Sequence, residues 1–214
     1  MKSHRIVYAG DARAFLEVGK NGWTLPIPLV KGAAGWRFDT RAAQDEMRTR
    51  RIGRNELAAI QVVLAITDAQ EEYAAQGLKR DGVQQFAQRV LSTPGKRDGL
   101  YWPAAQDEPE SPLGPQAAEA KPGEAYHGYH YRILTRQGRD VPGGARSYVR
   151  NGRMTDGYAV LAWPAKWGDT GVMTFIVNHD GVVHERNLGP DTAALARAIA
   201  EYNPGPGWKP SATK

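Results

Sequence analysis

The sequence predicts an α+β protein in which a long amphipathic helix packs on an antiparallel sheet. Apolar residues recur at helical spacing through residues 57–73, which is typical of a helix with one buried face. Later in the chain, runs of strand-forming residues alternate with Asn-Gly, Asp-Gly and Gly-Gly pairs, which tight turns favour. The 24 Gly and 14 Pro among 214 residues also favour short strands over an all-helical array.

Residues 1–40 are expected to form a small β-meander. Asn21-Gly22 is a hairpin signal. Two prolines should interrupt the third β-like run, because proline has no N–H to donate to a neighbouring strand. A meander of about 40 residues is too small to bury a core alone, so it needs a partner. The β-like runs are residues 6–8, 15–18, 23–30 (with Pro26 and Pro28) and 35–38.

The helix is predicted to span roughly residues 45–76, with Gly77 as its stop. Leu57, Ile60 and Leu64 fall at i, i+3 and i+7, and we expect all three side chains to be buried. Gly53 costs about 1 kcal/mol relative to Ala inside a helix, so the helix should break or begin again there. A second apolar row follows the same period: Ala59, Val63, Ile66, Ala69 and Tyr73.

After this helix we expect a shorter helix over 83–90, a long loop, a sheet and a final helix. Six prolines deny regular structure to the loop, residues 92–125. One domain, 41–204, is expected to hold the helices and the sheet, and residues 205–214 are expected to be a flexible tail. The predicted strands are 129–135, 158–164, 171–178 and 181–187, and the final helix is 193–202.

Several classes of function are excluded or disfavoured by composition and motif. The absence of Cys rules out disulfides, thiolate metal sites and cysteine nucleophiles. No run approaches 18 apolar residues, so no transmembrane segment is expected. No phosphate-binding loop, dinucleotide fingerprint or Gly-x-Ser-x-Gly elbow occurs, and no cofactor is expected. The basic stretch 48–54 is read as a solvated helix face rather than a nucleic-acid site, because no nucleic-acid motif accompanies it.

The most unusual local sequence is a cationic and aromatic stretch inside the central loop. Such a combination is typical of a site for a ligand or a partner protein. It is equally consistent with a structural plug, in which the aspartate pairs with a base and the tryptophan packs on the sheet. The candidate partner or ligand residues are Lys96, Arg97, Asp98, Tyr101 and Trp102.

Two close pairs of histidines offer a second candidate site. Together with a carboxylate they could supply the three or four N and O ligands of a zinc centre. Calcium is the other metal considered, because the acidic run 107–110 offers oxygen ligands. Side chains three apart on a strand point to opposite faces, so we expect the histidines not to converge. The candidate metal ligands are His127, His130, His179, Asp180 and His184.

Seven runs of the chain resemble the uncharacterised bacterial family known as domain of unknown function 2950. The resemblance implies export to the periplasm, because members usually begin with a signal peptide and a longer helical segment. On this basis residues 1–40 would be the remnant of a truncated N-terminal segment, whereas a true start at Met1 would imply a cytoplasmic protein. The runs are 36–40, 51–61, 91–103, 111–115, 126–129, 171–175 and 188–192.

The second half of the chain is also weakly similar in its order of elements to soluble domains of pilin-like and pseudopilin-like proteins. That likeness concerns architecture and implies no chemistry. The leading hypothesis from the sequence is an exported accessory or interaction protein without catalytic activity, whose loop 92–115 and sheet face a protein or small-molecule partner. The alternative is a metal-assisted hydrolase of small esters or lactones, in which the histidines activate water.

Overall fold

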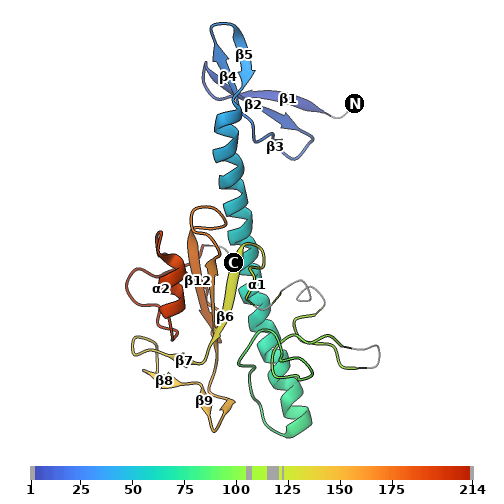
Figure 1. The fold of residues 1–214 in the computed structure, drawn as a ribbon, viewed down its shortest axis with the longest axis vertical. Coiled ribbons are helices and arrows are strands. Elements are labelled where there is room, and N and C mark those ends of the chain that lie inside the picture. The colour runs from blue at the N-terminus through green and yellow to red at the C-terminus, as the bar shows by residue number, and fades with distance from the viewer. Residues whose placement is uncertain (1–2, 105–107, 115–120, 122, 213–214) are drawn as a thin grey trace. The chain divides into compact units, whose positions relative to one another are not determined.

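The computed structural model describes residues 3–104, 108–114, 121 and 123–212. The chain divides into two compact units, Met1–Gly53 and Arg54–Lys214, and each is described here by itself (Figure 1). None of the described helices combines the length and apolarity needed to cross a bilayer.

The first unit is the predicted β-meander. Pro26 and Pro28 separate β3 from β4, as their missing N–H groups predict. Gly22 has φ +70° in the turn between β2 and β3, where the Asn-Gly pair predicts a hairpin. The strands run in the order β1-β2-β4-β5, and β3 also pairs with β2. They are β1 (His4–Tyr8), β2 (Arg13–Val18), β3 (Trp23–Thr24), β4 (Leu29–Gly32) and β5 (Gly35–Phe38).

Helix α1 (Thr40–Asp81) is longer than predicted at both ends. Asp39 caps its start, since the Asp39 carboxylate accepts the N–H groups of Arg41 and Ala42 at 3.2 and 3.1 Å. The helix continues through Gly53, so the predicted break there is wrong. Gly77 does not stop the helix either. A Cβ at Gly77 would lie 3.3 Å from the Val83 carbonyl oxygen, so this glycine permits a close crossing of the chain instead.

The buried face of α1 is the second apolar row. Ile60 is buried and Leu64 is half-buried, but Leu57 is 52% exposed, so its predicted burial is wrong. The core row combines small and larger residues, and all of them belong to the hydrophobic core that α1 shares with the sheet. Its members are Ala59, Val63, Ile66, Ala69 and Tyr73.

The second unit contains the predicted antiparallel sheet. The strands lie in the order β14-β13-β12-β11-β6, so β6 and β14 are its edges. The four predicted strands are confirmed, and the segment expected to be a flexible tail adds β14 beside β13. Small paired strands, β7 with β8 and β9 with β10, follow β6 in the chain. The strands are β6 (Tyr129–Leu134), β7 (Arg136–Gln137), β8 (Arg146–Ser147), β9 (Val149–Arg150), β10 (Arg153–Met154), β11 (Ala159–Pro164), β12 (Met173–Asn178), β13 (His184–Asn187) and β14 (Lys209–Pro210).

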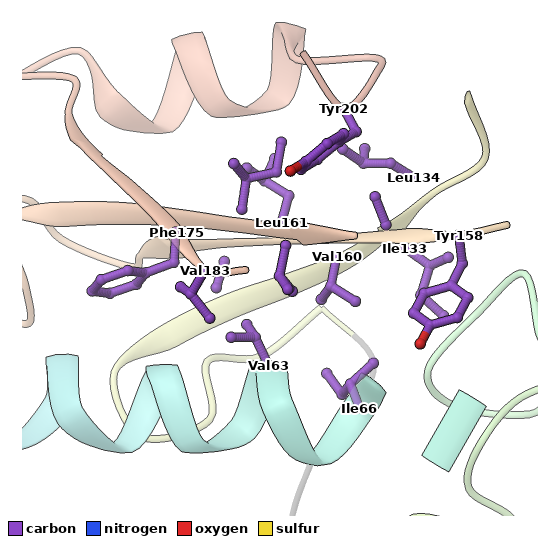
Figure 2. Close-up of a cluster of buried hydrophobic side chains, with 14 of the residues drawn as sticks. Val63, Ile66, Ile133, Leu134, Tyr158, Val160, Leu161, Phe175, Val183 and Tyr202 are labelled. Atoms are coloured by element: carbon purple, nitrogen blue, oxygen red, sulfur yellow. The ribbon is translucent and has the colours of Figure 1, made fainter. Parts of the chain in front are cut away.

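The core lies on both faces of this sheet. Figure 2 shows Val63 and Ile66 of α1 against one face, with Val160 and Ile133 above them. Leu161 points to the opposite face, toward α2 (Thr192–Ala198). This division follows the alternation of side chains along β11 and places the sheet between a long and a short helix. The packing of the long helix on the sheet is as the sequence predicts.

The segment 83–90 is not helical, which makes the prediction of a second helix wrong. Its backbone groups instead form hydrogen bonds with other parts of the chain. The Phe86 N–H donates to the Met154 carbonyl at 2.7 Å, and Ala87 is bound at both its N–H and its C=O by the buried Gln70 side chain. The segment is therefore extended, contacts α1 through Gln70, and connects α1 to the central loop.

Candidate functional site

A cavity of about 680 Å³ lies along the edge strand β6, within the second unit. Its wall comes from parts of the chain that are far apart in sequence: the segment that leads into the central loop, the segment that leaves it, two neighbouring strands and α2. The lining residues are 88–94, Lys121, Gly123, Glu124, Tyr126, 130–133, Trp163 and Arg197.

The loop side of the cavity is held in place by a backbone bridge. The Ser92 N–H donates to the Tyr101 carbonyl, and the Tyr101 N–H donates to the Val90 carbonyl, both at 2.9 Å. A Cβ at Gly99 would lie 2.7 Å from the Leu91 carbonyl carbon, so only glycine permits this close approach. These backbone hydrogen bonds thus hold the first part of the central loop in one conformation, so that it can form one wall of the cavity.

The floor of the cavity is aromatic and cationic. Trp163 and His130 face each other across β11 and β6, with ring centroids 5.5 Å apart. The Arg132 guanidinium lies 5.7 Å from the Trp163 ring centroid, a cation–π contact. Trp163 Nε1 and Arg132 Nε are both buried and have no hydrogen-bond partner among the described residues, and both residues line the cavity. Unpaired donors of this kind are costly unless an acceptor is supplied.

Arg132 also joins the floor to α2. Its Nη2 donates to the Ala196 carbonyl at 2.9 Å and to the Ile199 carbonyl, and its Nη1 donates to the Arg197 carbonyl at 3.2 Å. These carbonyls belong to the last turn of a helix, which lacks intrahelical donors. Because the guanidinium tips are occupied in this way, Arg132 contributes charge to the cavity from a fixed position.

A lowered pKa favours the neutral form of the His130 imidazole. Burial lowers the pKa of its imidazole, the positive charge of Arg197 lowers it further, and a hydrogen bond with the Glu124 backbone opposes both effects only in part. A neutral imidazole can donate one hydrogen bond and accept another without adding charge. The charge of the cavity therefore comes from its arginine and lysine side chains.

The cavity wall is predominantly positive. Its charged lining residues are four cations and one carboxylate, Glu124, which lies 3.8 Å from Lys121. Arg89 lies 3.7 Å from Asp98 and also donates to the Thr93 hydroxyl. Arg197 is exposed, and its guanidinium makes no ion pair within the described part of the chain. The cations are Arg89, Lys121, Arg132 and Arg197.

Asp98 and Trp102, two of the five candidate loop residues, have internal partners. Asp98 accepts hydrogen bonds from the Thr93 N–H at 2.8 Å and the Thr93 hydroxyl at 2.9 Å. Burial opposes ionisation of Asp98, but these bonds and the charge of Arg89 lower its pKa overall. Trp102 is buried, and its Nε1 donates to the Pro109 carbonyl at 3.2 Å. These two residues hold the loop together.

The other three loop candidates remain at the surface or near it. Lys96 is exposed, and Tyr101 is half-buried beside the bridge to Leu91. Arg97 is exposed, lies 3.2 Å from Glu108 and stacks its guanidinium 5.7 Å from the Trp102 ring centroid. Lys96, Arg97 and Tyr101 are not among the lining residues of the cavity.

The candidate metal ligands lie in separate surroundings. His127 is exposed at φ +49° beside Tyr126, whereas His130 is in the cavity floor. His184 lies near the ring of Tyr202 at a centroid distance of 6.4 Å. Within the described residues, no three His, Cys, Asp or Glu side chains form a group that could hold a metal ion.

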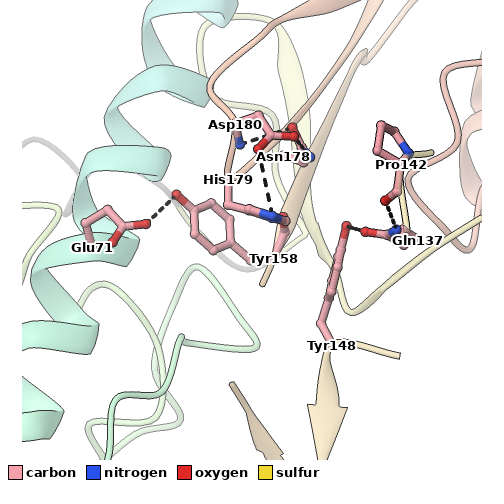
Figure 3. Close-up of polar contacts among 8 residues, drawn as sticks. All are labelled: Glu71, Gln137, Pro142, Tyr148, Tyr158, Asn178, His179 and Asp180. Atoms are coloured by element: carbon pink, nitrogen blue, oxygen red, sulfur yellow. Dashed lines mark hydrogen bonds and ion pairs between the residues drawn. The ribbon is translucent and has the colours of Figure 1, made fainter. Parts of the chain in front are cut away.

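His179 and Asp180 belong to a polar network beside the sheet (Figure 3). His179 Nε2 lies 4.0 Å from an Asp180 oxygen, and Asn178 donates to Asp180 at 2.8 Å. The His179 ring packs edge-on against Tyr158, whose hydroxyl donates to Glu71 at 3.2 Å. The network ties the end of β12 to α1.

Sequence reasoning missed most of the cavity, namely Arg89, Lys121, Tyr126, Arg132, Trp163 and Arg197. No local motif marks these residues. The signal that joins them is strand pairing, since the register of β6 and β11 sets His130 against Trp163. Residues 135–158 separate β6 from β11, so no turn of known length sets this register from the sequence.

Comparisons with known proteins give one result. The model of a family described as "Protein of unknown function (DUF2950)" matches residues 1–211. No curated protein and no solved structure matches the chain significantly. The likeness of the second half to pilin-like domains therefore stays a prediction.

Proposed function

We propose that this chain is a non-catalytic binding protein for an anionic partner, and we base the proposal on the chemistry of the cavity. The chain belongs to the DUF2950 family, whose description assigns no activity. The observation that carries this proposal is the charge of the cavity beside β6. Four cations line it against a single carboxylate, Glu124.

The size and composition of the cavity support binding. A volume of about 680 Å³ lies within the range of roughly 300–1,000 Å³ that is usual for ligand sites. Aromatic and aliphatic side chains form much of the wall, with polar groups at a few fixed positions. That combination is typical of a site that selects one class of partner.

The positive charge of the cavity wall favours acidic partners in two ways, through the affinity and through the association rate. Opposite charge increases the association rate and the affinity, and both effects weaken as salt screens the charges. Arg197 is the most available of the cations, because it is exposed and makes no ion pair within the described residues. Arg89 and Lys121 each have one carboxylate nearby, at 3.7 and 3.8 Å.

The test compares two charge reversals. Arg197→Glu changes a cavity residue, and Arg139→Glu changes an exposed arginine that is not in the cavity wall. We expect fluorescein-labelled hexaglutamate to bind the wild-type chain and the Arg139→Glu variant alike, and Arg197→Glu to weaken binding about tenfold or more. Fluorescence anisotropy at two salt concentrations measures both effects. Equal binding of labelled hexalysine, or no loss in Arg197→Glu, would contradict the proposal.

We also propose that the protein acts in the bacterial periplasm, as an accessory protein. Support comes from the family resemblance, which implies an exported protein. Fractionation of bacterial cells that express the complete natural gene tests this proposal. The protein should be released with periplasmic markers, and recovery with cytoplasmic markers would contradict it.

A further inference from the structure

Strand β6 is an edge of the main sheet. The contacts of its residues show which of them direct their backbone N–H and C=O groups toward β11 and which direct them outward. Tyr129 exchanges backbone hydrogen bonds with Tyr126, N–H to carbonyl in both directions, at 2.8 and 3.0 Å. Tyr129 is opposite Pro164 on β11, and proline has no N–H to give. The backbone of Tyr129 therefore faces away from β11, and alternate residues of β6 must do the same.

By this alternation, Tyr131 and Ile133 also direct their N–H and C=O groups away from β11. Thr135 confirms the phase, since its carbonyl accepts the Tyr148 N–H at 2.8 Å on the outer side. Within the described residues, neither Tyr131 nor Ile133 makes an outward backbone hydrogen bond. Among the described residues, the edge is thus paired at Tyr129 and at Thr135 and has no outward backbone partner between them.

This open window coincides with the cavity. Tyr131 and Ile133 both line it, with Arg132 between them. Two outward-facing residues are about 7 Å apart along a strand, so the window accommodates a short extended segment of about three or four residues. Exposed donors and acceptors at a sheet edge are a template for pairing with another chain.

We propose that the anionic partner is an extended acidic peptide that pairs with β6 as an additional strand, a step that rests on the proposed function. Backbone pairing with Tyr131 and Ile133 holds the peptide in place, and the cations select its charge. When a peptide adds as a strand to a sheet edge, its backbone hydrogen bonds commonly provide affinity and its side-chain contacts provide specificity.

The two faces of the sheet predict which peptide positions are acidic. His130 and Arg132 point to the face of α2, where Arg132 reaches the carbonyls of Ala196 and Arg197. Tyr131 and Ile133 point to the α1 face, and Figure 2 shows Ile133 on the side of the sheet that faces Val63 and Ile66. Side chains of an added strand alternate between the same two faces. The peptide should therefore alternate acidic and apolar residues.

The first test uses blocked and labelled peptides. Glu-Val-Glu-Val-Glu should bind the wild-type chain, and Lys-Val-Lys-Val-Lys should not. Two further peptides carry N-methyl groups, one on both valines and the other on the second and third glutamates. Methylation removes the N–H from one side of the strand only, so one isomer should bind about tenfold more weakly while the other binds as the parent does. In antiparallel pairing, the valine-methylated peptide is the weaker one.

The second test changes the strand itself. Ile133→Pro removes an outward N–H without removing a hydrogen bond to β11, and Ile133→Ala is the matched control that retains the N–H. The proline variant should bind the peptide about tenfold more weakly than the alanine variant. Near-ultraviolet circular dichroism checks that both remain folded, and the methylated peptides decide the question on the wild-type chain if Ile133→Pro does not fold.

The outcomes separate the two proposals. If the parent peptide binds, is sensitive to Arg197→Glu, and both methylated isomers bind equally, strand addition is wrong and binding of an anionic partner stands. If neither hexaglutamate nor the Glu-Val peptide binds, the proposed function itself fails. Selective loss in one methylated isomer supports strand addition.

Discussion

The side chain of Gln70 is bound at both ends by the backbone of Ala87. Gln70 Nε2 donates to the Ala87 carbonyl at 2.8 Å, and the Ala87 N–H donates to Gln70 Oε1 at 2.8 Å. Gln70 is fully buried. Within the extended segment 83–90, Phe86 pairs with Met154 of β10, and a buried amide on α1 takes the place of a strand partner at Ala87.

We predict that Gln70→Leu lowers the free energy of unfolding by about 2–4 kcal/mol. The change removes two hydrogen bonds and leaves the Ala87 N–H and C=O buried without partners. Gln76→Leu is the matched control, because the half-buried Gln76 side chain donates to Glu72 on the same helix and Glu72 is exposed. Urea unfolding of both variants measures the difference, and equal effects would show that the bonds to Ala87 do not stabilise the fold.

Truncation on the two apolar rows of α1 should have very different costs. Ile66 is 1% exposed and Leu57 is 52% exposed. We expect Ile66→Ala to cost about 2–5 kcal/mol through loss of burial and formation of a cavity. Leu57→Ala should change stability by less than about 1 kcal/mol. Thermal and urea unfolding measure both, and a large loss at Leu57 would mean that this side chain is buried in solution.

Gly171 is required for the packing of Tyr129. A Cβ at Gly171 would lie 2.6 Å from Tyr129 Cζ and against the hydroxyl, which donates to the Met173 carbonyl at 2.9 Å. Gly171→Ala should therefore destabilise the protein by about 1–3 kcal/mol through overpacking. In a Tyr129→Phe background the same change should cost less, because the hydroxyl is gone. A double-mutant cycle measures the coupling, and simple additivity would contradict the prediction.

The stability of the fold should decrease at alkaline pH. Burial raises the pKa of Tyr148 to about 12 and also that of Tyr202 to about 12, above the value near 10 in the unfolded chain. The folded state thus holds these protons more tightly. The associated stability is fully present below about pH 10 and is lost as the pH rises through about 12.

Tyr148→Phe tests the contribution of one tyrosine. At pH 8 the variant should be less stable than the wild type by about 1 kcal/mol, because Tyr148 donates to the buried Gln137 side chain at 3.1 Å. At pH 11 the gap should narrow, since only the wild type must ionise a buried hydroxyl at this position. Urea unfolding at the two pH values measures the gap, and a constant difference would contradict the assignment.

The sequence predicts the elements of this fold better than their partners. Turn pairs and periodicity locate the strands and α1 because these signals are local. The choice between the rows of Leu57 and Ala59 is not local, because both rows have helical spacing and only the sheet decides which is buried. The same holds for residues 83–90, whose conformation is set by Gln70.

The candidate site is harder to predict for a related reason. The sequence singles out the loop around Trp102, where unusual residues are close together along the chain, but Trp102 is buried and bonded internally. The cavity brings Arg89, Arg132 and Arg197 together from a loop, a strand and a helix. Each is an ordinary arginine in its own segment, and only the tertiary fold gives them a common role.

Strand β14 has a consequence for self-association. A sheet with two open edges can pair with further copies on both sides and so polymerise without limit. Here β14 pairs with β13 at His184 and Glu185, and Pro210 lies opposite His184 without an N–H that a further strand could use. Among the described residues of the main sheet, β6 offers outward backbone groups at Tyr131 and Ile133, whereas the β14 edge lacks a donor at Pro210. The main sheet therefore favours capture of a strand at β6 over continued growth at β14.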